Sequence, residues 1–117
     1  MKTINFILIL LCLCFINCQS AEAKKQKQCD ELDKKFAAML NTATDKCKTD
    51  ADCSCYPAGY TVDICGGICD KITADKLRAI DKINDEIGCG YRGMCGAWIC
   101  NPVCVDGFCK NDPDSKR

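Results

Sequence analysis

Cysteine is the residue type that offers this sequence most of its chemistry. The chain has 117 residues, of which 14 are cysteine and none is histidine. Without histidine, neither a Ser-His or Cys-His nucleophile pair nor a mixed Cys/His zinc site is available. No two cysteines after residue 23 have the C-x2-C spacing that marks thioredoxin-type redox motifs and zinc ribbons. The cysteines therefore predict structural disulfides, and we expect no metal, no cofactor and no enzyme activity.

Carboxylates are the other side chains with catalytic potential. Asp50 and Asp52 lie just before Cys53, and paired acids can transfer protons. In a turn bounded by cysteines, aspartates more often accept hydrogen bonds from backbone N–H groups. We therefore expect this pair to be structural.

The N-terminal segment has the features of an export signal. Lys2 precedes an apolar run over residues 4–16, and residues 21–23 (Ala-Glu-Ala) have the small-x-small pattern that signal peptidase recognises. These features predict a signal peptide over 1–23 and a secreted, extracellular protein.

Residues 15–18 (Phe-Ile-Asn-Cys) offer an alternative to simple secretion, because they resemble a bacterial lipobox. The resemblance implies acylation of Cys18, which would make the chain a lipid-anchored envelope protein. Both routes lead to an oxidising compartment, where thiols pair.

Eleven cysteines remain after the leader, which contains three of the 14. They make up roughly 12% of residues 24–117, above the roughly 8–10% that marks a secreted disulfide scaffold. Because eleven is odd, one cysteine stays unpaired or forms an intermolecular bond, which would link a homodimer. The sequence leaves the pairing open among Cys29, Cys47, Cys53, Cys55, Cys65, Cys69, Cys89, Cys95, Cys100, Cys104 and Cys109.

The segment between Cys29 and Cys47 has the periodicity of an amphipathic helix. Apolar residues recur there every three or four positions, which predicts a helix over about 29–42. A fully helical segment would hold these two cysteines roughly 27 Å apart. That separation is too large for a disulfide, so each cysteine is expected to bond elsewhere.

A second amphipathic helix is predicted over about 73–87. Thr73 is expected to be its N-cap, and Gly88 is expected to end it. Ile72 and Leu77 have the spacing of a hydrophobic staple at the N-terminus.

The rest of the predicted structure is short β-sheet. Asp106-Gly107 supplies both positive-φ positions of a type I′ turn, which predicts a β-hairpin over about 103–109. Residues 60–64 are a candidate short strand. The expected fold class is thus a small disulfide-rich α+β protein with two amphipathic helices and a C-terminal hairpin.

The domain organisation follows from these elements. Residues 24–28 are expected to be a polar tether, 29–110 a single disulfide-stabilised domain and 111–117 a disordered tail. Trp98 and Ile99 are expected to pack against the helices.

Residues 47–53 have the pattern C-x2-D-x-D-C, which resembles the opening of several extracellular cysteine-rich modules. These include whey-acidic-protein, colipase-like and dickkopf-like modules. Over about residues 47–109 the chain also resembles small cysteine-rich exported proteins and lipoproteins of bacteria that have no established activity. The resemblance implies a disulfide-bonded extracellular module. Whey-acidic-protein domains carry adjacent cysteines, which this chain lacks, so their inhibitory activity is not implied.

The expected function is non-catalytic binding, as in toxins, pheromones and receptor ligands, with an extracellular protein as the partner. Disulfide-bonded loops are stiff and lose little entropy on binding. Residues 24–117 carry 15 basic and 15 acidic side chains, so we expect no nucleic-acid contact. Membrane contact is expected only if Cys18 is acylated. The contact candidates are the residues that are hardest to place in a core: Tyr56, Tyr60, Tyr91, Arg92 and Trp98.

A serine protease inhibitor is a further alternative. The loop between Cys89 and Cys95 contains Arg92, and several small inhibitors present a basic residue to a trypsin-like enzyme from a short cysteine-closed loop.

Overall fold

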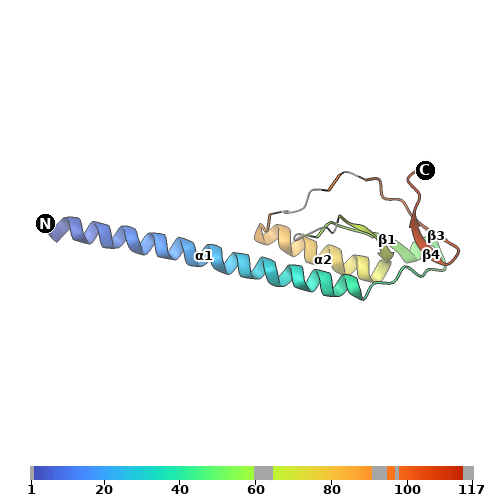
Figure 1. Ribbon diagram of the computed structural model, residues 1–117, viewed down its shortest axis with the longest axis horizontal. Helices are drawn as coiled ribbons and strands as arrows, with labels where there is room; N and C mark the ends of the chain where they lie inside the picture. Colours follow the sequence, from blue (N-terminus) through green and yellow to red (C-terminus); the bar gives the residue numbers. More distant parts are fainter. Residues whose placement is uncertain (1, 60–64, 91–94, 97, 115–117) are drawn as a thin grey trace.

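A computed structural model describes residues 2–59, 65–90, 95–96 and 98–114 (Figure 1). These residues form two helices and two small antiparallel sheets, tied together by five disulfides. The predicted class, a small disulfide-rich α+β protein, is confirmed at this level. All the cysteines lie within the described residues.

Helix α1, Lys2–Asn41, is much longer than the predicted helix over 29–42. The predicted C-terminal end agrees with the structure. The predicted start is wrong, because most of the expected leader and the expected tether over 24–28 are helical too. Residues 24–28 are lysines and glutamines, which favour helix, and neither glycine nor proline occurs before Pro57. In Figure 1 the N-terminal half of α1 projects away from the rest of the molecule.

The projecting part of α1 contains an 18-residue stretch with a mean hydropathy of 2.0, none of it buried. By length and composition this stretch is able to cross a membrane, and a signal sequence has the same properties.

Helix α2, Lys71–Ile87, runs antiparallel to the second half of α1 (Figure 1). The prediction of Thr73 as N-cap is wrong: Asp70 caps the helix, and its Oδ1 accepts a hydrogen bond from the Thr73 backbone N–H at 2.8 Å. The predicted staple is wrong as well, because Ile72 is 70% exposed. The predicted end is confirmed by Gly88, whose φ of 79° is the left-handed conformation that glycine adopts without strain.

The hydrophobic core lies between the two helices and is small. Phe36 of α1 and Leu77 and Ile80 of α2 are buried together. Asn84 of α2 is also fully buried, and its side-chain amide has no hydrogen-bond partner among the described residues. A core of this size contributes little to the free energy of folding. The five disulfides therefore contribute a large share of the stability of the fold. Around the core, half-buried side chains pack from α1 and from the segment Cys53–Tyr56: Leu32, Met39, Leu40 and Tyr56.

The first sheet pairs β1, Cys53–Tyr56, with β2, Gly67–Asp70. The sequence did not predict this sheet, because two four-residue strands have too little periodicity to be recognised. A 3-10 turn, η1, precedes it at Asp50–Asp52. The candidate strand over 60–64 lies outside the described residues.

The second sheet is the predicted hairpin, formed by β3, Pro102–Val105, and β4, Phe108–Asn111. Asp106 and Gly107 have φ values of 52° and 82°, as a type I′ turn requires. Lys46 pairs with Phe108 on the other side of β4, which joins the hairpin to the segment after α1.

Two expectations about the C-terminal region are wrong. Trp98 and Ile99 do not pack into the helices, since they are 41% and 69% exposed. The first residues of the expected tail are ordered: Asn111 belongs to β4, and the Asn101 side chain donates a hydrogen bond to the Asp112 carbonyl at 2.8 Å. Strand pairing therefore extends beyond the predicted hairpin.

Asp70 is expected to make the fold sensitive to acid. Besides capping α2, its Oδ2 accepts a hydrogen bond from the Thr44 backbone N–H at 3.0 Å. Burial alone would raise the pKa of Asp70, but the hydrogen bonds from Thr44 and Thr73 outweigh it and lower the pKa below its ordinary 3.8. A carboxylate whose pKa is lower in the folded than in the unfolded protein stabilises the fold at pH values above the unfolded-state pKa. This contribution is lost as the pH falls through the folded-state pKa. We expect Asp70→Ala to lower the free energy of unfolding at pH 7 by about 1–2 kcal/mol.

Asp70→Asn is the matched control, because asparagine is an equally good N-cap that does not titrate. The free energy of unfolding is measured with urea at pH 7 and at a pH below 3.8. At pH 7 Asp70→Asn should keep most of the stability of the parent, and between the two pH values it should lose less stability than the parent does. Equal acid sensitivity in Asp70→Asn and the parent would contradict the role of Asp70.

Candidate functional site

The alternation of side chains along β1 determines which cysteines can bond. Cys53 and Cys55 lie on one face of the strand and Ser54 on the other. Ser54 is paired directly with Cys69 of β2, and its Oγ accepts a hydrogen bond from Arg78 of α2 at 3.0 Å. The face that carries Ser54 and Cys69 is therefore turned towards α2, and the face that carries Cys53 and Cys55 is turned away from it.

The cysteines on the outer face of β1 bond to the C-terminal region. Cys53 bonds to Cys109 of β4, and Cys55 bonds to Cys100 just before β3. Cys69, on the inner face, is the one cysteine after residue 23 that forms no disulfide. Because β-strand alternation separates it from the bonded face, Cys69 is the odd cysteine that the count predicted.

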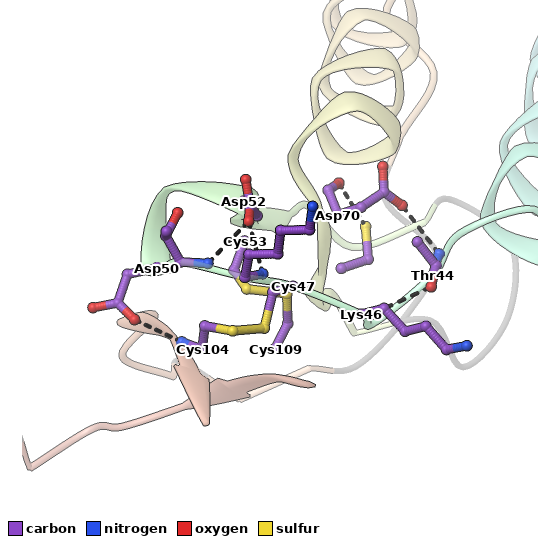
Figure 2. The surroundings of a disulfide bond; sticks show 12 residues. Thr44, Lys46, Cys47, Asp50, Asp52, Cys53, Asp70, Cys104 and Cys109 are labelled. Atoms are coloured by element: carbon purple, nitrogen blue, oxygen red, sulfur yellow. Dashed lines mark hydrogen bonds between the residues drawn. A yellow bond between two sulfur atoms is a disulfide. The ribbon is translucent and has the colours of Figure 1, made fainter. Parts of the chain in front are cut away.

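The hairpin brings two disulfides side by side (Figure 2). Cys104 and Cys109 are opposite each other in the β3–β4 register, so both point to the same face. Cys104 bonds to Cys47, and Cys109 bonds to Cys53. The sulfur atoms of Cys47, Cys53 and Cys109 all lie within 4.8 Å of one another.

The first of the two remaining disulfides ties α1 to the end of α2, and the second ties the loop between β1 and β2 to the segment before β3. Cys29 of α1 bonds to Cys89, directly after α2. The prediction that Cys29 and Cys47 do not bond to each other is confirmed. Cys65 bonds to Cys95, so the loop between Cys89 and Cys95 is not closed by a disulfide of its own.

The acidic pair has the predicted structural role. The Asp50 carboxylate accepts a hydrogen bond from the Cys104 backbone N–H at 2.7 Å and so occupies the outer edge of β3 (Figure 2). Asp52 accepts hydrogen bonds from the backbone N–H groups of Lys48 and Thr49 at 2.8 and 2.9 Å. The hydrogen bond from Lys48, followed by that from Thr49, lowers the pKa of Asp52. Both carboxylates accept hydrogen bonds from backbone amides, which is the structural role expected of this pair.

Two of the five contact candidates lie within the described residues. Tyr56 is half-buried against the core, and this burial raises the pKa of its phenol. Trp98 is exposed, as a contact residue requires. Tyr60, Tyr91 and Arg92 lie outside the described residues. Of the two, Trp98 is therefore better placed to touch a partner.

The outer face of the hairpin is an apolar surface that the sequence analysis missed. Because Cys104 and Cys109 point inward, the neighbouring cross-strand pairs point outward. Val105 and Phe108 form one such pair and are 41% and 44% exposed. The period-two pattern around the predicted turn was a signal that could have shown this face. We call it the hairpin face, and it consists of Val103, Val105, Phe108 and Lys110.

The helices also form a shallow apolar groove of about 310 Å³. Leu32 of α1 and Ile83 and Ile87 of α2 line its floor. Gln28, Glu31 and Lys35 line the rest of it and give it a polar rim.

Cys69 is expected to be unreactive in the folded protein. Its thiol is buried, and burial, followed by the charge of Asp70, raises its pKa to about 11. Since the thiolate is the nucleophile, iodoacetamide should leave native mature protein unmodified. In denaturant without reductant, mass spectrometry should find a single added group, on Cys69. Rapid alkylation of the native protein, or more than one added group after denaturation, would contradict this assignment.

The chain matches no protein family, no characterised protein and no solved structure. Its own structure defines it as a small cysteine-rich protein held by five disulfides, which is the kind of fold that persists in an oxidising environment.

Proposed function

We propose that the chain is a secreted, non-catalytic binding protein that uses the hairpin face to recognise another extracellular protein. Toxins, pheromones and receptor ligands act in this general way. The observation that carries the proposal is the exposed pair Val105 and Phe108, held on a hairpin whose opposite face is fixed by two disulfides.

The distribution of apolar side chains supports a contact surface. The core buries Phe36, Leu77 and Ile80, while aromatic and branched side chains of the C-terminal region remain exposed. A single exposed apolar residue needs no explanation, but Val105 and Phe108 are adjacent. Because the hairpin is already rigid, a partner would bind it with little loss of conformational entropy.

The acidic side chains support a non-catalytic role. Asp50 and Asp52 hold backbone N–H groups of the hairpin and of the residues just before η1 in place. Their function is to keep the surface in shape.

The leader supports export. The apolar stretch of α1 is fully exposed, so it has no packing role in the domain. Cys18 is also exposed on this helix, which keeps the lipid-anchored alternative open to test. Mass spectrometry of the mature N-terminus separates the two routes, because signal cleavage leaves Lys24 first and lipidation leaves an acylated Cys18.

The buried position of Cys69 supports the free-thiol alternative over the disulfide-linked homodimer. A buried thiol cannot reach a second copy without opening the core. A non-reducing gel of the mature protein should therefore show a monomer.

The hairpin face is tested with Phe108→Asp. Extracellular proteins that bind the immobilised parent are identified by mass spectrometry, and the affinity of the main partner is then measured by titration. A central aromatic contact contributes at least about 2 kcal/mol, so we expect Phe108→Asp to weaken this affinity by about 30-fold or more.

Ile83→Asp is the matched control, since Ile83 is 41% exposed but lies on α2, away from the hairpin. It should bind the partner like the parent. If Ile83→Asp weakens binding as much as Phe108→Asp, or if Phe108→Asp binds unchanged, the hairpin face is not the contact surface.

A further inference from the structure

We propose that Cys47, Cys53, Cys104 and Cys109 form a tetrathiolate site for one zinc-like divalent metal ion when their two disulfides are reduced. In the structure the four cysteines are oxidised, and they form the pair of adjacent bridges shown in Figure 2.

The sulfur positions fit such a site. Three sulfur atoms lie within 4.8 Å of one another, and the fourth, of Cys104, is bonded to that of Cys47. In a tetrahedral zinc site each Zn–S bond is about 2.3 Å, which places the ligand sulfurs about 3.8 Å apart. Among the described residues, no other group of three cysteine or carboxylate side chains converges in this way.

Hydrogen bonds join the backbones of three of the four cysteines to neighbouring segments, in addition to the disulfides. The Cys47 N–H donates to the Gly107 carbonyl at 2.9 Å, and the Cys109 N–H donates to the Asp45 carbonyl at 2.5 Å. The Cys104 N–H donates to Asp50. These contacts join the hairpin to the segment that contains Cys47 and so favour the closeness of the ligands after reduction.

The surroundings fit the charge and the access that the site needs. A divalent ion with four thiolates has a net charge of −2, and Lys46 and Lys48 flank Cys47 in the sequence. An open depression of about 430 Å³, lined by Lys46, Cys47, Lys48 and Asp52, leads from solvent to the Cys47 side of the cluster. The depression brings solvent to Cys47, one of the four proposed ligands.

Metal binding and disulfide formation are mutually exclusive at this cluster. Each of the two disulfides takes up two electrons and two protons from a dithiol, which itself becomes a disulfide. The metal then binds the four sulfurs and displaces their protons into solvent. Reoxidation to the two disulfides withdraws all four ligands and releases the ion.

The test uses the secreted protein, reduced with excess dithiol under anaerobic conditions and then freed of the reductant. Cd²⁺ is the probe, because its bonds to thiolate absorb in the ultraviolet. We expect the absorbance to saturate at one tightly bound Cd²⁺ per chain, and Zn²⁺ to compete for the same site.

Two double variants that remove equal numbers of thiols distinguish this site from general thiol binding. Cys47→Ser with Cys104→Ser removes two ligands, and Cys65→Ser with Cys95→Ser removes two cysteines outside the cluster. We expect the first variant to bind Cd²⁺ more than about 100-fold more weakly than the reduced parent and the second to bind it like the parent. Equal affinities in the two variants, or uptake that follows the total number of thiols, would overturn the proposal whether or not the hairpin face binds a protein.

Discussion

Replacing both Cys29 and Cys89 with alanine should release α1 from α2 and lower the free energy of unfolding by about 4 kcal/mol. The Cys29–Cys89 disulfide spans 60 residues of sequence, and cross-links that close long loops restrict the unfolded chain most. Among the five disulfides it is the one that contains a residue of α1, so without it the helix is held by the small core alone. For a domain of this size the melting temperature should fall by about 20 °C.

Thermal unfolding and hydrogen exchange measure this effect. Amides of residues 30–41 should lose protection while those of the hairpin keep it, because the bridges to β4 and to Cys104 are untouched. Cys69→Ala is the control, since it removes a cysteine without removing a disulfide, and it should have a much smaller effect. A double variant within about 1 kcal/mol of the parent would show that packing, not the cross-link, holds α1.

Truncation of Leu77 to alanine is expected to cost about 3 kcal/mol in the free energy of unfolding. Leu77 is fully buried between α1 and α2 and contacts the same cluster as Phe36 and Ile80. Removing a buried leucine loses its transfer free energy and leaves a cavity, which together cost about 2–5 kcal/mol.

Ile72→Ala is the matched control for Leu77→Ala. It also shortens an aliphatic side chain on α2, but Ile72 is exposed. Urea unfolding should give it less than about 0.5 kcal/mol of destabilisation. Similar losses in the two variants would mean that the described core does not support the fold.

Local sequence signals predicted the elements that depend on local interactions. The apolar stripe and Gly88 located α2, and Asp106-Gly107 located the hairpin, because caps and turn types are decided by neighbouring residues. The predicted N-cap, Thr73, lies three residues after the observed one, Asp70. Both residue types are good N-caps, so the local sequence did not distinguish them. Contact with Thr44, distant in the sequence, distinguishes Asp70 from Thr73.

Features that depend on distant segments were not predictable from the sequence. Strands β1 and β2 are four residues each and are defined by pairing across an intervening loop. The inward position of Tyr56 follows from that pairing, which explains why Tyr56 was proposed for contact although it packs against the core. The outward position of Val105 and Phe108 differs in this respect, because the period-two pattern beside the predicted turn places them on the face opposite Cys104 and Cys109.

All five bridges connect the first part of the domain to the last: their earlier members are Cys29, Cys47, Cys53, Cys55 and Cys65, and their later members lie between residues 89 and 109. A polypeptide that is threaded through a membrane with its N-terminus leading would expose every earlier cysteine before a single correct partner has emerged. Oxidation at that moment can only yield mispaired species, and these must later be reshuffled through mixed disulfides. Maturation should therefore depend on a disulfide isomerase, and production in a host that lacks one should accumulate scrambled isomers of the correct mass.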